Sequence, residues 1–165
     1  MAVDATLGNG NDSLCIAKQI GPKGHLYAFD IQERAIEKSR ALFESNEVEN
    51  NYTFILDSHE KICDYVDSNI DFAIMNLGYL PGGDKSIVTK GNTSVKCIEN
   101  ILKLLKANGI LAISSYSGHD SGYEQKQVVD YLANLNQKEY NVLAMDFINQ
   151  VNSPARFYLI EKALD

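Results

Sequence analysis

The sequence predicts an α/β fold, in which a mostly parallel seven-stranded sheet carries helices on both faces and ends in an antiparallel hairpin. Segments typical of strands and of amphipathic helices alternate along the whole chain. Most strand-like segments are nearly continuous apolar runs, as expected for strands that are buried on both faces. The length of 165 residues lies within the usual range for one domain, so residues 1–165 are expected to form a single domain.

Four segments of the first half are expected to be strands, because they are short apolar runs bounded by polar turn residues. They cover residues 1–4, 25–30, 52–57 and 70–77. Helices are expected where apolar residues recur at helical spacing between these strands. They cover residues 12–20, 32–45 and 59–66. Asp12 is a preferred N-cap residue for the first of these helices, and the Gly-Pro-Lys-Gly segment 21–24 should end it.

The second half continues the alternation and ends in two adjacent strands. A long helix is expected over residues 93–107, because Ile98 and Leu105 share one face and Asn-Gly follows as a stop signal. A strand, a polar loop and another helix should follow, at residues 110–115, at 116–122 and up to about 135. The last strands, 141–148 and 155–161, are joined by a connection too short for a crossover helix, so they should form an antiparallel hairpin.

Charge and cysteine usage restrict the class of protein. The net charge of −7 argues against broad nucleic-acid binding, which depends on Lys and Arg neutralising phosphates. Three widely spaced cysteines fit neither a disulfide framework nor a zinc site, so no metal is predicted, and Cys15 and Cys97 are expected to be buried thiols. No apolar run approaches the roughly 20 residues of a membrane span, and no signal pattern is present, so a cytoplasmic protein with no membrane partner is expected.

Polar segments follow each of the first four strands, and in an open α/β sheet such segments meet at the ligand-binding edge. The candidate cofactor residues are Asp4, Gly8, Asn9, Gly10, Asn11 and Asp12 after the first strand, Asp30 and Gln32 after the second, Asp57, Ser58 and His59 after the third, and Asn76 and Leu77 after the fourth. We expect the glycines to let backbone N–H groups approach a ligand beside a helix N-terminus. A carboxylate at Asp30 can accept both hydroxyls of a ribose.

The loop after the first strand favours S-adenosylmethionine over a dinucleotide. The dinucleotide fingerprint needs a third glycine, and Ser13 stands in its place. The acidic Asp4 suits a ligand that carries an ammonium and a sulfonium better than one that carries a pyrophosphate. Gly8 and Gly10 could also serve a tight turn alone, but four polar segments agree on a cofactor site. Together these residues predict a Rossmann-like fold that binds S-adenosylmethionine.

Several motifs resemble the family labelled putative rRNA methylases. The segments are Asp-Ala-Thr-Leu-Gly-Asn-Gly-Asn-Asp at 4–12, Phe-Asp-Ile-Gln at 29–32, Asn-Leu-Gly-Tyr-Leu-Pro-Gly-Gly-Asp-Lys at 76–85, Tyr-Ser-Gly-His at 116–119 and Ile-Glu-Lys at 160–162. The resemblance covers nearly the whole chain and implies a Rossmann-like methyltransferase fold. Characterised members of this family methylate the 5-aminomethyl group of the wobble uridine in tRNA. Members usually carry a further segment before the first strand, so we expect a short N-terminal segment to be missing here.

Four residues are candidates for the reaction site. Asn76 and Tyr79 have the same spacing as Asn and Tyr in the Asn-Pro-Pro-Tyr motif of amino-methylating enzymes, although both prolines are replaced. The Asn76 carbonyl can accept a hydrogen bond from the target nitrogen, and the Tyr79 ring can stack on a base. His119 is suited to be a general base or a substrate contact, and Tyr116 could line the pocket. The alternatives are that Tyr79 packs on the sheet edge and that His119 makes only a loop hydrogen bond.

The predicted function is S-adenosylmethionine-dependent N-methylation of 5-aminomethyl(-2-thio)uridine at the tRNA wobble position. The fold and the cofactor follow from the residues, whereas the tRNA anticodon region as a partner follows from the family resemblance. The alternatives are a small-molecule or rRNA methyltransferase and a non-catalytic S-adenosylmethionine-binding protein. A homodimer is compatible with the sequence.

Overall fold

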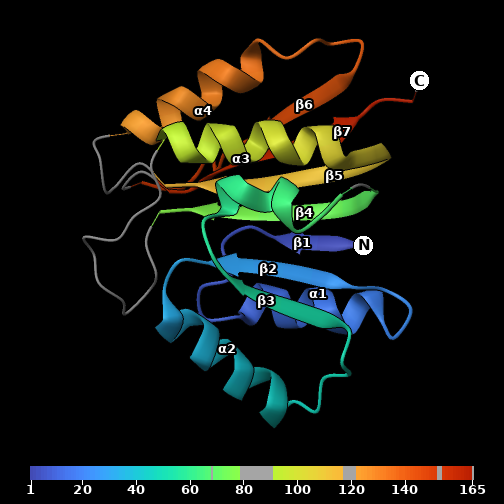
Figure 1. Cartoon of the computed structure of the whole chain (residues 1–165). Coiled ribbons are helices and arrows are strands. Elements are labelled where there is room, and N and C mark those ends of the chain that lie inside the picture. Colours follow the sequence, from blue (N-terminus) through green and yellow to red (C-terminus); the bar gives the residue numbers. More distant parts are fainter. Residues whose placement is uncertain (68, 79–90, 117–121, 152–153, 165) are drawn as a thin grey trace.

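The fold is a single seven-stranded sheet flanked by helices (Figure 1). The computed structural model describes residues 1–67, 69–78, 91–116, 122–151 and 154–164. The described residues form the strands β1 Ala2–Asp4, β2 Leu26–Asp30, β3 Tyr52–Leu56, β4 Ile70–Leu77, β5 Leu105–Ser115, β6 Tyr140–Met145 and β7 Arg156–Lys162. They lie in the order β3-β2-β1-β4-β5-β7-β6. Strands β1 to β5 pair in parallel, whereas β7 pairs antiparallel with both β5 and β6, which confirms the expected sheet and C-terminal hairpin.

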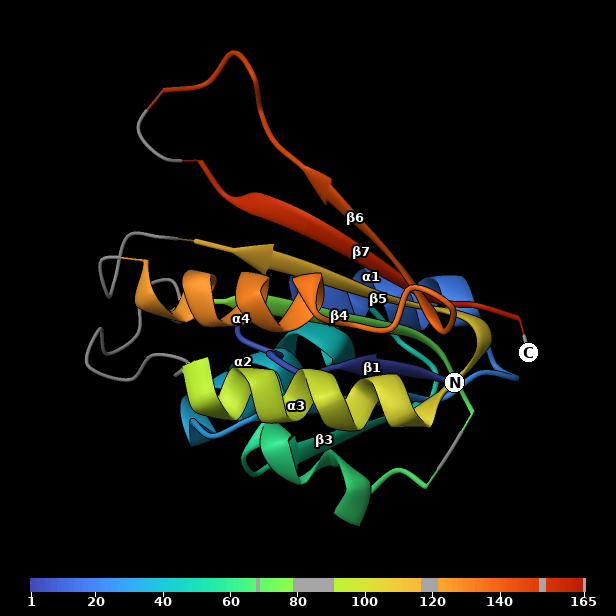
Figure 2. The same cartoon turned by 90° about the horizontal axis from the view of Figure 1, so that it is seen from above.

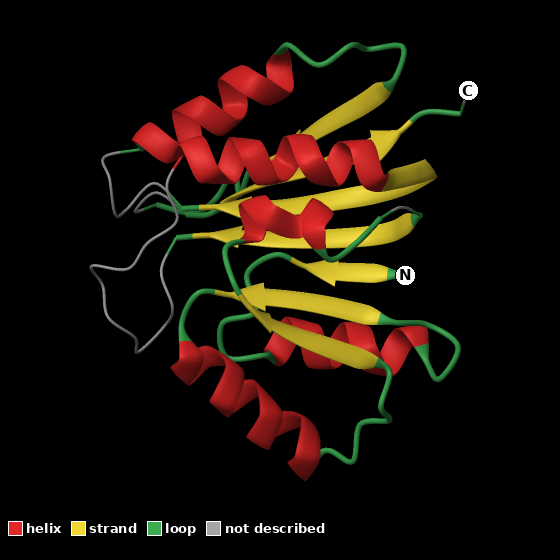
Figure 3. Cartoon of the chain, viewed as in Figure 1, coloured by secondary structure: helices red, strands yellow, loops and turns green. Residues whose placement is uncertain are grey.

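Helices cover both faces of this sheet, as the alternating pattern predicted (Figure 3). The helices are α1 Asn11–Ile20, α2 Glu33–Ser45, α3 Gly91–Leu104 and α4 Tyr123–Ala133, together with the short 3-10 helix η1 His59–Asp64. Figure 2 shows α1 and α3 on opposite sides of the central strands. None of the described helices is long and apolar enough to cross a bilayer.

The core consists of one apolar cluster on each face of the sheet. The larger cluster lies under α3, η1 and α4, and it contains Phe29, Met75 and Ile101, none of which is exposed. The smaller cluster lies under α1 and α2, where the ring of Phe43 packs edge-on against Tyr52 at a centroid distance of 4.5 Å. Burying a large apolar side chain stabilises a fold by roughly 1.5–3 kcal/mol, so these two layers hold the strand ends in place.

Two helix ends differ from the prediction. Helix α1 begins at Asn11 with Gly10 as its N-cap, so Asp12 lies in the first turn and is not the cap. Gly10 can take this position because its left-handed φ of 79° is accessible to glycine. Helix α3 ends at Leu104 and does not reach residue 107, because Leu105 pairs with Ile70 of β4 and pairing in the sheet outweighs local helix propensity.

Smaller differences concern one cysteine and several element boundaries. Cys97 is buried as expected, but Cys15 is exposed, because it lies on the outer side of α1. The first strand of the hairpin ends at Met145, earlier than the predicted residue 148, and helix α4 ends at Ala133. None of these changes falls within the segments that are predicted to bind the cofactor.

The strand order places a topological switch point at the carboxyl end of β1. Strand β1 pairs with β2 on one side and with β4 on the other, so the chain order reverses there. Beyond the strand, Ala5 N–H donates to the Ile74 carbonyl of β4, whereas Leu7 N–H donates to the Phe29 carbonyl of β2. Ligands of open α/β sheets bind at such a switch point.

Candidate cofactor and substrate site

The turn between β1 and α1 leaves the start of the helix open to a ligand. Gly8 and Gly10 both have positive φ values, of 56° and 79°. A Cβ at Gly10 would lie 2.6 Å from the Ser39 hydroxyl oxygen, so the turn packs too tightly against α2 for a larger residue. The N-cap Gly10 has no side chain to cap α1, and the backbone N–H groups of a first helical turn are suited to an anionic group.

Asp4 lies beneath this turn and organises it. The carboxylate is fully buried, and its two oxygens accept the Thr6 backbone N–H at 3.0 Å and the Ser13 hydroxyl at 2.7 Å. Burial raises the pKa of Asp4 to about 6, although both hydrogen bonds oppose that rise. Asp4 therefore shapes the loop through these two hydrogen bonds, and its contact with a cofactor stays a prediction.

Asp30 ends β2, as predicted, and faces the glycine turn. One carboxylate oxygen accepts the Gly8 N–H at 2.9 Å, and the other accepts the Gln32 N–H at 2.9 Å. Burial raises the pKa of Asp30, while these backbone hydrogen bonds oppose the rise. Gln32 is the N-cap residue of α2. It contacts Asp30 through its backbone N–H, and its side chain makes no capping hydrogen bond. The half-buried carboxylate keeps lone pairs that can accept ribose hydroxyls.

Ile31 is a candidate that the sequence analysis missed. Its apolar side chain follows Asp30 directly and is 58% exposed, although isoleucine is one of the residues most often buried. An exposed apolar surface next to the carboxylate that is predicted to bind ribose is suited to the face of an adenine ring. The signal in the sequence was an isoleucine immediately after a strand-ending acid.

The residues after β3 form a network of their own at the same edge. Asp57 accepts hydrogen bonds from the Ser58 N–H at 2.7 Å, the Lys61 ammonium at 2.8 Å and the Tyr65 hydroxyl at 2.9 Å. These contacts, with the Lys61 bond as the largest, lower the pKa of Asp57 to about 2, so it is ionised at neutral pH. Its remaining lone pairs and the half-buried Ser58 can still meet an adenine edge.

His59 begins η1 and contacts the segment that follows β1. Its Nδ1 lies 3.2 Å from the Ala5 carbonyl oxygen, and burial lowers the pKa of the ring. A neutral ring with a hydrogen on Nδ1 donates to that carbonyl. The structure therefore connects the segment after β3 with the loop after β1, which the spacing in the sequence did not reveal.

Asn76, near the end of β4, makes two hydrogen bonds to the segment that follows β1. Its backbone N–H donates to the Thr6 hydroxyl oxygen at 2.7 Å, and its side-chain amide donates to an Asp12 carboxylate oxygen at 2.8 Å. Leu77 is buried, so only its backbone could face a ligand. Asn9 lies in the turn and accepts a long hydrogen bond of 3.4 Å from Lys38, whereas Asn11 is the first residue of α1.

The other reaction-site candidates are only partly described. Tyr116 follows β5 and is 49% exposed. Its ring lies beside the end of β4, because a Cβ built on Gly78 would be 4.0 Å from a Tyr116 ring carbon. Tyr79 and His119 lie outside the described residues. The structure therefore brings Asn76 and Tyr116 to one edge, and the other two remain predictions.

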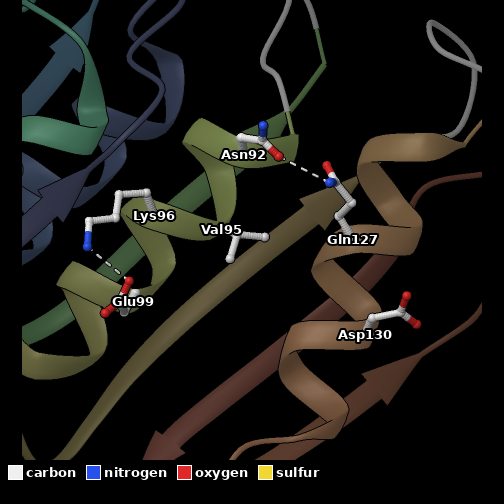
Figure 4. Close-up of a pocket in the computed structure, with 6 residues that line it drawn as sticks. All are labelled: Asn92, Val95, Lys96, Glu99, Gln127 and Asp130. Atoms are coloured by element: carbon white, nitrogen blue, oxygen red, sulfur yellow. Dashed lines mark hydrogen bonds and ion pairs between the residues drawn. The ribbon is translucent and has the colours of Figure 1, made fainter.

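The structure also has a hollow on the face of the sheet that carries α3 and α4. It is a shallow groove between α3 and α4, lined by Asn92, Val95, Lys96, Glu99, Gln127 and Asp130 (Figure 4). Its polar side chains bind one another, as in the Lys96–Glu99 ion pair at 3.1 Å. None of the predicted cofactor residues lines it. Among the described residues, no cluster of His, Cys, Asp or Glu could hold a metal ion.

Known proteins resemble this chain along nearly its whole length. The profile of the family described as Putative rRNA methylase matches residues 26–161. A chloroplastic tRNA (mnm(5)s(2)U34)-methyltransferase of Arabidopsis thaliana is 33% identical over 97% of this chain, which spans 62% of that relative's length. Among solved structures, a putative rRNA-methylase from Clostridium thermocellum is 37% identical with a TM-score of 0.94, and the match covers 98% of this chain and 87% of that one. A putative methyltransferase from Streptococcus mutans in complex with SAH is also 37% identical, with a TM-score of 0.88 and the same coverage.

Proposed function

The chain belongs to the Putative rRNA methylase family, and from this premise we propose that it is an S-adenosylmethionine-dependent methyltransferase. The observation that carries the proposal is the open glycine turn at the β1–β4 switch point, with Asp30 on one side and Asn76 on the other. The relative from Streptococcus mutans, whose structure contains SAH, supports the choice of cofactor.

The described residues fit this cofactor. The N–H groups of the first turn of α1 would hold the methionine carboxylate, and Asp30 would accept the ribose hydroxyls. Ile31 would cover one face of the adenine, while Asp57 and Ser58 would meet its edge. When bound, the cofactor supplies a methyl group on a positively charged sulfonium. The buried Asp4 carboxylate below the loop would favour such a cation electrostatically.

Asn76 would orient the acceptor nitrogen. Methyl transfer from a sulfonium is an in-line displacement, so the protein contributes mainly by positioning and by excluding water. The Asn76 carbonyl oxygen can accept an N–H of a neutral amine and thereby direct its lone pair. Tyr116, exposed at the same edge, is available to contact the substrate.

We propose the 5-aminomethyl group of the tRNA wobble uridine, with or without 2-thiolation, as the acceptor. The name of the Arabidopsis relative and the amino-methylating spacing of Asn76 and Tyr79 support it. The net charge of −7 requires that any RNA contact be local, and it favours a small-molecule amine as the second candidate.

The test is methyl transfer from labelled S-adenosylmethionine to bulk tRNA that lacks the terminal wobble methylation, followed by nucleoside mass spectrometry. The expected product is labelled 5-methylaminomethyluridine or its 2-thio form. The Asp30→Ala variant serves as the matched control, because it should lose the label together with cofactor binding. Label on no nucleoside, while calorimetry shows intact binding of S-adenosylhomocysteine, would exclude the tRNA substrate and leave the small-molecule alternative.

A further inference from the structure

Asn76 is held by the cofactor loop through two independent hydrogen bonds. Its side-chain amide nitrogen lies 2.8 Å from an Asp12 carboxylate oxygen, across 64 positions of sequence. Its backbone N–H lies 2.7 Å from the Thr6 hydroxyl oxygen. Thr6 and Ser13 are in turn tied to the buried Asp4, so a closed set of hydrogen bonds links the ends of β1 and β4 with the first turn of α1.

The bond to Asp12 determines which way the Asn76 amide faces. An ionised carboxylate has only acceptors, so the amide must present its nitrogen to Asp12. The carbonyl oxygen lies on the other side of the amide carbon and so points away from the Asp12 carboxylate. A flipped amide would bring this oxygen against the carboxylate, and two acceptors repel. Asp12 is exposed and sits on the first turn of α1, so the pair lies at the edge of the proposed cofactor site.

We propose that Asp12 is a positioning residue that acts through Asn76, in place of the direct cofactor contact that the sequence suggested. It holds the Asn76 carbonyl oxygen ready for an N–H of the incoming amine, and so selects a nucleophile that brings a hydrogen-bond donor. This inference rests on the proposed methyltransferase function. It also implies that the same short segment serves both substrates, because the backbone of α1 would hold the cofactor while its Asp12 side chain orients the acceptor group.

The first test is Asp12→Asn, which preserves size but lets position 12 either donate or accept. The amide of Asn76 is then free to flip. Loss of one charge-assisted hydrogen bond corresponds to a fall in kcat of roughly 10- to 100-fold, whereas the Kd of S-adenosylhomocysteine should change by less than about threefold. Glu37→Gln, which removes an exposed carboxylate on α2, is the matched control and should change neither value. If Asp12→Asn instead weakens S-adenosylhomocysteine binding strongly and leaves kcat unchanged, Asp12 is a cofactor ligand and the proposal is wrong.

Exchanging the residues at positions 12 and 76 should rescue kcat, which a merely structural role would not do. Asn76→Asp alone places two carboxylates face to face and should lower kcat. Combining it with Asp12→Asn restores a donor–acceptor pair in reverse, with a carboxylate oxygen of position 76 still facing the substrate. The double variant should therefore exceed Asn76→Asp in kcat by about tenfold. If the fall in kcat of the double variant equals the product of the falls in the two single variants, the proposal is wrong.

A measurement without substrate separates this inference from the proposed function. In the ¹⁵N NMR spectrum of the protein with S-adenosylhomocysteine, the side-chain amide of Asn76, assigned by its absence in Asn76→Asp, should exchange slowly and shift in Asp12→Asn. This result would support the fixed amide even if the wild type failed to methylate tRNA. An amide signal identical in the wild type and Asp12→Asn would refute it, whatever the substrate.

Discussion

The buried carboxylate of Asp4 should make the stability of the protein depend on pH in a way that one substitution removes. The pKa of Asp4 is raised from 3.8 to about 6, mainly by burial. The native state therefore binds the proton more tightly than the unfolded state does. The stabilisation that the protonated Asp4 gives to the native state is complete below pH 3.8 and is lost as the pH rises through about 6. Because one pKa unit corresponds to about 1.4 kcal/mol, ionising Asp4 costs the native state about 3 kcal/mol by pH 7.

Asp4→Asn removes this ionisation while keeping an oxygen that can accept the Thr6 N–H. When the pH is raised from 5 to 7, the unfolding free energy of Asp4→Asn should increase relative to that of the wild type by about 1 kcal/mol. Urea denaturation of both proteins at several pH values measures this difference directly. Glu37→Gln, an exposed control, should show no such trend relative to the wild type. Stability curves of the wild type and Asp4→Asn that stay parallel over this range would refute the argument from burial.

Three further substitutions test other parts of the site and the core. Asp30→Ala should weaken S-adenosylmethionine binding by roughly 1.5–3 kcal/mol, because a charged acceptor is lost, and unchanged affinity in calorimetry would contradict the ribose assignment. Ile31→Asp should weaken S-adenosylhomocysteine binding on the order of tenfold if the exposed side chain covers adenine, with Leu143→Asp on the distant edge strand β6 as an exposed apolar control. Gly10→Ala should lower unfolding free energy by about 1–3 kcal/mol, because φ is 79° and the added Cβ would meet Ser39, and an unchanged midpoint in urea would contradict this.

The order of strands and helices was predictable because local patterns decide it. The apolar runs identified β2 and β4, and Asp30 was placed correctly because an acid directly ends an apolar run. The end of α3 was not predictable, since Leu105 has good helix propensity and only its pairing with Ile70 of β4 makes it a strand residue. Boundaries set by tertiary pairing are not contained in any local window of sequence.

The same distinction applies to the site. Sequence patterns assigned Asp12 to a helix cap and to the cofactor, and Asn76 to the cofactor and to the reaction, because each was judged within its own motif. Their hydrogen bond depends on the parallel register that sets Asp4 beside Ile74, and this register brings the start of α1 next to the end of β4. His59 likewise meets the Ala5 carbonyl only because β3 and β1 end at the same edge. Contacts between motifs require the sheet order, which spacing alone does not supply.

The carboxylates around the glycine turn explain in physical terms why this loop suits a cationic cofactor. Burial is the main cause of the raised pKa of Asp4, and like-charge repulsion from Asp12 and Asp30 adds to it, so the loop holds negative charge at an energetic cost. A pyrophosphate would add further negative charge and increase the repulsion, whereas a sulfonium and an ammonium would relieve it. Dinucleotide loops avoid this problem by surrounding the phosphates with backbone N–H groups and a third glycine, where this chain has Ser13 bonded to Asp4. The exchange of that glycine for a serine that binds a buried acid therefore changes both the shape and the charge preference of the site.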